Sequence, residues 1–250
     1  RLAIVGIGPG DASSHTVAAD AALRGASDIV GYRLYFDLLG SAIAGKTLHP
    51  GTLGAEEERA RLALDLAAEG RMVALVSSGD AGIYGLASLA FELIDREARA
   101  DWRRIAIEVV PGVSAMQAAA ARLGAPLGHD FCVISLSDLL TPWEAIERRL
   151  EAAAAGDFVI ALYNPRSARR LDQLARAREI LLAKRAGDTP VALARNLGRS
   201  GERVTVTTLA ALDPAAADML TLLLVGSSAT RKLGGADLIY TPRGYGAKRP

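Results

Sequence analysis

The stretch LAIVGIGPGD, residues Leu2 to Asp11, places an apolar run directly before a glycine-rich turn. Two further stretches repeat this order: VALVSSGDAGIYG covers Val73–Gly85, and VVPGVSA covers Val109–Ala115. Continuous apolar runs indicate buried parallel strands, and open α/β sheets bind ligands at the carboxyl ends of such strands. Glycine lets backbone N–H and C=O groups approach a ligand closely. The three stretches therefore predict one pocket built from several strand ends.

The composition excludes several classes of protein. The 250 residues are 50% hydrophobic and carry 29 basic against 28 acidic side chains, a net charge of +1, which argues against nucleic acid as a partner. No apolar run approaches the roughly 20 residues of a membrane span. The single cysteine, Cys132, excludes an intrachain disulfide and favours the reducing cytoplasm. We expect no metal site, and the positive mean hydropathy predicts a homodimer that hides apolar surface.

The order of the elements predicts an α/β protein of two lobes, each a mixed sheet flanked by helices. Strands expected at Leu2–Ile7, Arg71–Val76 and Ile105–Val110 alternate with helices. The segment Gly124–His129 then interrupts the pattern with two glycines and a proline, and we interpret it as the hinge. The predicted parts are a first lobe at 1–123, a second lobe at 124–235 and a C-terminal tail at 236–250.

The second half continues the alternation of strands and helices. We expect strands at Phe131–Leu136, Phe158–Tyr163, Val191–Arg195, Val204–Thr208 and Leu220–Gly226. Val204–Thr208 alternates apolar and threonine residues, which is typical of an antiparallel strand with one face more exposed to solvent. Helix N-caps are expected at Ser13 or Ser14, at Thr141 with Glu144 in a capping box, and at Ser167.

The first turn differs from the dinucleotide-binding fingerprint in its spacing. Its glycines are Gly6, Gly8 and Gly10, with Pro9 between the last two, instead of G-x-G-x-x-G. Because proline lacks an N–H, the turn is poorly suited to pyrophosphate and favours a non-phosphorylated nucleoside.

Two polar residues in the other turns each leave two interpretations open. Asp80 offers a carboxylate for a cation, a hydroxyl or a proton in transit, or it caps the next helix. Ser114 is either a ligand contact or a helix N-cap.

The three turns together resemble the motifs of the tetrapyrrole methylase family, S-adenosylmethionine-dependent enzymes with a two-lobed class III fold. GIGPGD is similar to the family's N-terminal loop, SSGDAGIYG to its G-D-x-x-x-Y-G element and VVPGVSA to its P-G-x-S-A element. The resemblance implies that S-adenosyl-L-methionine binds between the lobes and leaves as S-adenosylhomocysteine. The cofactor-binding residues that it implies are Gly8, Pro9, Gly79, Asp80, Ile83, Tyr84, Ser114 and Ala115 in the first lobe and Tyr163, Asn164, Asn196 and Thr221 in the second.

Four further segments resemble one branch of that family, which methylates precorrin-3B at ring carbon 17 in cobalamin (vitamin B12) synthesis. They are Gly31–Leu39, Gly128–Trp143, Leu162–Ser167 and Ala194–Arg199. The resemblance implies methyl transfer with ring contraction to precorrin-4. One alternative is a cobalt-factor III methyltransferase of the anaerobic route, although the chain has no cysteine cluster for iron–sulfur. An alternative from another class is a nicotinamide-binding oxidoreductase.

Ring contraction requires a hydroxyl to lose a proton, and the chain offers few bases for that step. Of the 3 histidines, only His129 adjoins the predicted hinge. It is a candidate base, with a backbone-bonded structural histidine as the alternative. Asp80 and Ser137 complete the candidate catalytic set, and Ser137 is placed with Ser135 to bind a ring hydroxyl or a carboxylate arm. Four arginines in predicted loops also suit carboxylates: Arg33, Arg166, Arg195 and Arg199.

Overall fold

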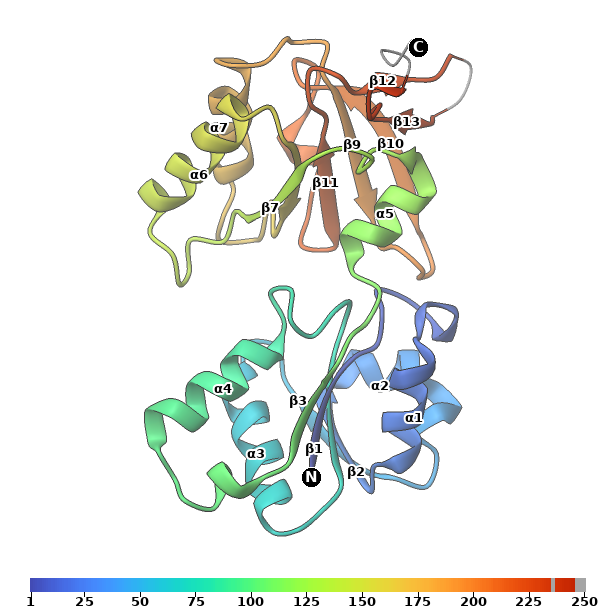
Figure 1. Cartoon of the computed structure of the whole chain (residues 1–250), viewed down its shortest axis with the longest axis vertical. Helices are drawn as coiled ribbons and strands as arrows, with labels where there is room; N and C mark the ends of the chain where they lie inside the picture. The colour runs from blue at the N-terminus through green and yellow to red at the C-terminus, as the bar shows by residue number, and fades with distance from the viewer. Residues whose placement is uncertain (235–236, 246–250) are drawn as a thin grey trace. The chain divides into compact units, whose positions relative to one another are not determined.

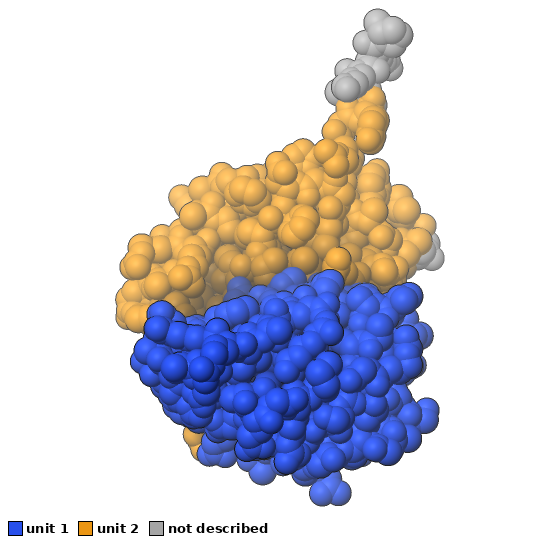
Figure 2. Space-filling model, turned by 60° about the horizontal axis from the view of Figure 1, so that its bottom comes forward, with its two compact units in different colours: residues 1–115 blue, residues 116–250 orange. Residues whose placement is uncertain are grey.

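The computed structural model describes residues 1–234 and 237–245 (Figure 1). The chain divides into two compact units, Arg1–Ala115 and Met116–Pro250, which Figure 2 draws in different colours. The predicted first lobe extends to residue 123, but the division falls directly after Ala115, the first residue of helix α5 (Ala115–Leu123). The reason is packing, since Met116 and Leu123 of this helix join the apolar cluster of the second unit's sheet.

The first unit is built on a five-stranded sheet in the order β3-β2-β4-β1-β5, and every pairing in it is parallel. Successive strand residues point to opposite faces. Ile4 and Leu75 therefore pack with the helices α3 and α4, whereas Val5 and Val76 pack with α1 and α2. The bounds are β1 Leu2–Gly6, α1 Val17–Gly25, β2 Asp28–Tyr32, α2 Arg33–Leu39, β3 Thr47–Gly51, α3 Glu56–Ala68, β4 Val73–Ser77, α4 Leu86–Glu97 and β5 Ile107–Val110.

The second unit holds a mixed five-stranded sheet in the order β10-β9-β11-β8-β7. Only β7 and β8 pair in parallel, and the strand predicted to be antiparallel is confirmed as β10. Helices α6 and α7 share one apolar cluster with this sheet, and α5 shares another with it. The bounds are β7 Phe131–Ser135, α6 Trp143–Ala155, β8 Val159–Tyr163, α7 Gln173–Leu182, β9 Pro190–Arg195, β10 Arg203–Thr208 and β11 Thr221–Val225.

A small third sheet joins the predicted hinge to the predicted tail. Its strands are β6 (Gly124–Ala125), β12 (Arg231–Lys232) and β13 (Ile239–Tyr240), in the order β12-β13-β6. The tail prediction is thus corrected for residues 237–245, because β13 pairs with β6 and Ile239 is buried. Residues 236 and 246–250 of that prediction lie outside the described residues.

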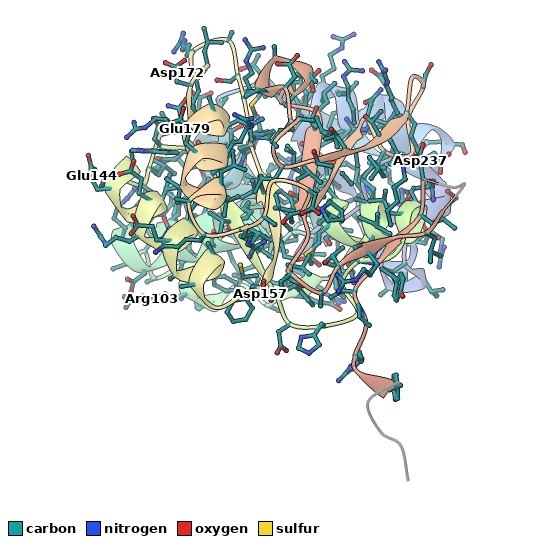
Figure 3. The ribbon with its side chains drawn as sticks, turned by 90° about the horizontal axis from the view of Figure 1, so that it is seen from above. Arg103, Glu144, Asp157, Asp172, Glu179 and Asp237 are labelled. Carbon is teal, nitrogen blue, oxygen red and sulfur yellow. The ribbon has the colours of Figure 1, made fainter. Side chains whose placement is uncertain are left out.

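Helix starts differ from the predicted caps. The cap of α1 is Thr16, whose Oγ1 accepts a hydrogen bond of 3.0 Å from the N–H of Ala19. Neither α6 nor α7 has a side-chain cap bond, and α7 begins after Asp172, which Figure 3 labels. Ser167 belongs instead to a tight turn closed by reciprocal backbone bonds with Arg170. Within the described residues, no helix is both long and apolar enough to cross a membrane.

Candidate functional site

The three glycine turns meet at one edge of the first sheet. Strands β4, β1 and β5 are parallel neighbours, so their carboxyl ends lie side by side. The N–H of Gly8 donates to the carbonyl of Gly79 at 3.1 Å, and the N–H of Gly79 donates back to the carbonyl of Gly8 at 2.8 Å. The three strand ends therefore lie together in this unit, and that they form one ligand pocket stays a prediction.

Asp80 ties the second turn to the third. Its Oδ1 accepts a 2.8 Å hydrogen bond from the N–H of Gly82, and its Oδ2 accepts one of 3.0 Å from the N–H of Gly112. It does not cap α4, whose N-cap is Gly85. Because both carboxylate oxygens already hold backbone donors, the geometry makes Asp80 a clamp between turns and does not support it as the proton acceptor.

Glycine is required in these turns for two different reasons. A Cβ atom at Gly6 would lie 2.7 Å from the amide nitrogen of Gly112 and 2.7 Å from the carbonyl oxygen of Gly79. The turns therefore pack backbone against backbone. Gly8 and Gly79 have φ angles of +73° and +69°, a conformation that side chains disfavour. The glycines thus build the turns themselves, and the finished turns present backbone groups at the edge.

The remaining cofactor candidates of the first unit border these turns. Pro9 is buried beside Gly8, and Ser114 is 1% exposed immediately before α5. Tyr84 has a φ of 52° and is 55% exposed. A left-handed tyrosine costs about 1–2 kcal/mol, and such outliers cluster at ligand sites. Ile83, in the turn after β4, and Ala115, at the start of α5, are both half-buried.

The second unit gathers its own candidates at one edge of its sheet. In the register of the sheet Ser135 pairs with Tyr163, and Arg195 pairs with Thr221, so the ends of β7, β8 and β9 and the start of β11 coincide. The Nδ2 of Asn164 donates to the Oγ of Ser135 at 3.0 Å. All four residues predicted for this lobe, Tyr163, Asn164, Asn196 and Thr221, lie at this edge or directly after it.

Two asparagines leave this edge in the left-handed conformation. Asn164 and Asn196 have φ angles of 51° and 55°. Asparagine tolerates this region better than other side chains do. The N–H of Asn196 donates to the carbonyl of Leu220 at 2.9 Å, which holds the loop after β9 against the start of β11.

Asp218, which the sequence did not single out, organises the same edge. Its Oδ1 accepts from the Thr221 hydroxyl at 2.8 Å, and its Oδ2 accepts from the Nε of Arg195 at 2.8 Å. Burial raises the pKa of this carboxyl, but the hydrogen bonds from Thr221 and Arg195 outweigh burial and hold the pKa below its ordinary value. Arg195, predicted to bind a ligand carboxylate, is therefore paired within the protein.

His129 lies away from the other catalytic candidates. It precedes β7, so it is at the amino edge of the second sheet, whereas Ser135 and Ser137 are at the carboxyl edge. The whole of strand β7, about 13 Å of extended chain, lies between His129 and the edge that carries Ser135. The His129 side chain is 53% exposed, and its Nδ1 accepts a 2.8 Å hydrogen bond from the N–H of Asp130. The structure thus matches the backbone-bonded alternative and does not bring His129 together with Ser137.

The other two histidines pair with acids in the first unit. The Nδ1 of His15 lies 2.9 Å from Asp20, and the Nε2 of His49 lies 2.8 Å from the buried Asp28. Within the described residues, no group of His, Cys, Asp and Glu side chains is arranged to hold a metal ion.

Ser137 contacts an arginine that the sequence did not indicate. The Nη1 of Arg170 donates to the Oγ of Ser137 at 3.3 Å, and its Nη2 donates to the carbonyl of Asn164 at 3.0 Å. Arg170 therefore joins the segments after β7 and β8. In the sequence Arg170 lies three residues after Ser167, beyond the segment Leu162–Ser167, and no local spacing links it to Ser137.

Comparison with known proteins shows the family to which this chain belongs and some of its relatives. A family model described as Tetrapyrrole (Corrin/Porphyrin) Methylases matches residues 1–213. A probable cobalt-factor III C(17)-methyltransferase of Salmonella typhimurium is 45% identical, over 98% of this chain and 99% of its own length. A precorrin-3B C(17)-methyltransferase of Sinorhizobium sp is 44% identical, over 98% of this chain and 96% of its own. The crystal structure of the methyltransferase CobJ is 44% identical and superposes with a TM-score of 0.90, over 96% of this chain and 99% of that one.

Proposed function

Since this chain belongs to the tetrapyrrole (corrin/porphyrin) methylases, we propose that it methylates carbon 17 of a precorrin with contraction of the macrocycle, in cobalamin synthesis. It is an S-adenosylmethionine-dependent C-methyltransferase. The observation that carries the proposal is the set of interlocked turns at the carboxyl edge of β4, β1 and β5. These turns are the motif segments by which the sequence resembles the family, and the nearly full-length relatives support the assignment to carbon 17.

The residues present fit a sulfonium cofactor. When bound, S-adenosylmethionine supplies an electrophilic methyl group. Methyl transfer from a sulfonium needs alignment more than it needs a strong acid or base. The turns match that need, because Gly8 and Gly79 fix one another and the Asp80 carboxylate is already engaged by the N–H groups of Gly82 and Gly112. Their part is to bind and orient the cofactor through backbone groups.

Several parts of the assignment remain proposals. The roles of Tyr163, Asn164, Asn196 and Thr221 in cofactor binding stay predictions, supported by their position at one edge of the second sheet. We favour the metal-free precorrin-3B as substrate over its cobalt-containing counterpart. We also propose a homodimer, consistent with Val17 of α1, which is 85% exposed, and a cytoplasmic location, consistent with the single free Cys132.

Calorimetry followed by product analysis tests the proposal. We expect S-adenosylhomocysteine to bind and to raise the midpoint temperature of thermal unfolding, whereas NAD does neither. At 100 times its Kd, a ligand adds about 2.7 kcal/mol to the free energy of unfolding. Ala115→Trp places a bulky side chain beside Gly79, so it should abolish this binding and leave the fold intact. Incubation of the wild type with S-adenosylmethionine and either precorrin-3B or cobalt-factor III, read by mass spectrometry, identifies the substrate. Binding of NAD, or no methylated product from either macrocycle, would overturn the assignment.

A further inference from the structure

A cavity of about 320 Å³ lies in the second unit, between the segment 166–171 and the segment 217–220. Its lining is largely apolar, and Leu171, Met219 and Leu220 are 51%, 52% and 45% exposed. Such side chains at a cavity mouth mark a surface that gains from being covered. A cavity of this size accepts part of a large flat molecule.

The loop after β7 carries two more exposed leucines. Leu139 and Leu140 are 83% and 93% exposed. They directly follow Asp138, whose Oδ2 accepts a 2.7 Å hydrogen bond from the Nε2 of Gln173 at the start of α7. The loop is therefore held beside the segment that carries Leu171.

Two arginines at the cavity have no acidic partner within the described residues. Arg166 lines the cavity and is half-buried, and Arg170 contacts the sulfur of Met219 at 3.5 Å. Among the residues that the structure describes, no carboxylate forms an ion pair with either guanidinium. The acidic residue of the lining, Asp218, is already paired with Arg195. Two positive charges therefore remain uncompensated beside an apolar surface.

The position of Arg170 is set before any ligand binds. Reciprocal backbone bonds with Ser167, of 3.0 and 3.2 Å, close the turn that carries it, and Ser137 and the carbonyl of Asn164 orient its two terminal nitrogens. Its Nε is buried and has no hydrogen-bond partner among the described residues. A guanidinium has five N–H donors, so donors remain for another acceptor. Asp172, two residues further on, is exposed, and among the described residues no ion pair joins it to Arg170 (Figure 3).

We propose that Arg166 and Arg170 bind a carboxylate arm of the tetrapyrrole, with its ring edge against Leu171, Met219 and Leu220. The inference rests on the proposed function, because it takes the substrate to be an apolar macrocycle with acetate and propionate arms. The chemistry of the site is recognition of a carboxylate by guanidinium forks next to an apolar face. The methionine carboxylate of the cofactor has the same chemistry, but it brings no large apolar face to cover the exposed leucines.

Binding measurements on the full chain test this assignment without turnover. The probes are uroporphyrin III, its octamethyl ester, and S-adenosylhomocysteine, with the porphyrin's own fluorescence anisotropy as readout and calorimetry for the cofactor product. The variants are Arg166→Met, Arg170→Met and Arg170→Lys. Arg169→Met is the matched control, because Arg169 is the exposed arginine of the same turn. Among the described residues Arg166 has no hydrogen bond that holds the turn, so its variant tests the site even if Arg170→Met loosens the loop.

We expect the Kd for uroporphyrin III to rise about 10- to 100-fold in Arg166→Met and Arg170→Met, the range for loss of a charge-assisted hydrogen bond. Arg170→Lys should recover part of the loss, and Arg169→Met should bind as the wild type does. The ester should bind all variants equally, and the affinity for S-adenosylhomocysteine should not change.

Three results would overturn the assignment. They are unchanged uroporphyrin affinity in both methionine variants, no uroporphyrin affinity in the wild type, and a loss of S-adenosylhomocysteine affinity instead, which would give the arginines to the cofactor. Failure of the wild type to methylate either macrocycle, with the arginine-dependent binding intact, would refute the proposed function alone.

Discussion

Gly112→Ala is the sharpest test of the interlocked turns. The added Cβ would overlap the carbonyl oxygen of Gly79 and lie 2.7 Å from the carbonyl carbon of Gly6. Both neighbours are backbone atoms, so no side chain can rotate to make room. Relief requires the turns after β1, β4 and β5 to separate, which breaks hydrogen bonds such as that from the N–H of Gly112 to Asp80.

The expected magnitude follows from two contributions. Overpacking in a well-packed region costs about 1–3 kcal/mol, and each lost hydrogen bond adds about 0.5–1.5 kcal/mol. With the one bond from Gly112 to Asp80 lost, we therefore expect Gly112→Ala to lower the free energy of unfolding of the first unit by about 1.5–4.5 kcal/mol. Gly79→Ala has its nearest neighbour at 3.8 Å, the amide nitrogen of Ala115, so only its φ of +69° opposes the change. That variant should cost about 1–2 kcal/mol.

The assay separates the first unit from the second. The chain has two tryptophans, of which Trp102 is buried in the first unit and Trp143 lies in the second. In a Trp143→Phe background, Trp102 fluorescence during urea unfolding reports the first unit alone, which avoids treating two units as one transition. Gly25→Ala is the control, because no atom lies within 4 Å of its Cβ position and alanine favours the helix. The reasoning fails if Gly112→Ala unfolds within 1 kcal/mol of the parent, or if Gly79→Ala is the more damaging change.

The remaining predictions concern a buried acid and the exposed histidine. The pKa of Asp28 is held below its ordinary value of 3.8, first by the hydrogen bond with His49 and against the effect of burial, so its contribution to stability is present above about pH 4 and is lost as the pH falls through the folded pKa. Asp28→Asn should lower the free energy of unfolding at pH 7 by about 1–3 kcal/mol and flatten its decline below pH 4, and parallel pH curves for variant and parent would contradict this. His129→Ala should turn over near the parental rate with the same contracted product, because His129 lies at the amino edge of its sheet; a rate lower by the roughly 10²–10⁴ of general base catalysis would restore it as the base.

The parts of the fold that follow from local pattern were predictable from the sequence. Strands β1, β4 and β5 were found to within two residues because each is a continuous apolar run. Strands β2 and β3 were missed. β3 has the sequence TLHPG, and its Pro50 and Gly51 are residue types with low propensity for strands. It survives as the edge strand, where a proline need not supply a ladder hydrogen bond.

The candidate site was predictable where neighbouring parallel strands bring their ends together. It was not predictable where the direction of a strand determines at which edge of the sheet a residue lies. His129 is close to Ser135 in sequence, and only the direction of β7 shows that they lie at opposite edges. Asp80 follows a glycine at a strand end, as a functional carboxylate would. Its two backbone donors come from its own loop and from a turn 32 residues away, and the second of these contacts is not visible in the sequence. Arg170 reaches Ser137 across 33 residues, a contact that no local spacing signals.

The reciprocal bonds between Gly8 and Gly79 also bear on what ligand binding costs. Because each amide of the pair is held by the other turn, and Asp80 holds the third turn, the segments are ordered before a ligand arrives. A ligand that binds to these ordered turns loses its own translational and rotational entropy, but its binding does not also pay the entropy of ordering three loops. The same bonds make the amides of Gly8 and Gly79 a built-in reporter. Hydrogen exchange at these two amides requires the two turns to separate. Both amides should therefore exchange at the same rate, and a bound ligand should slow both rates.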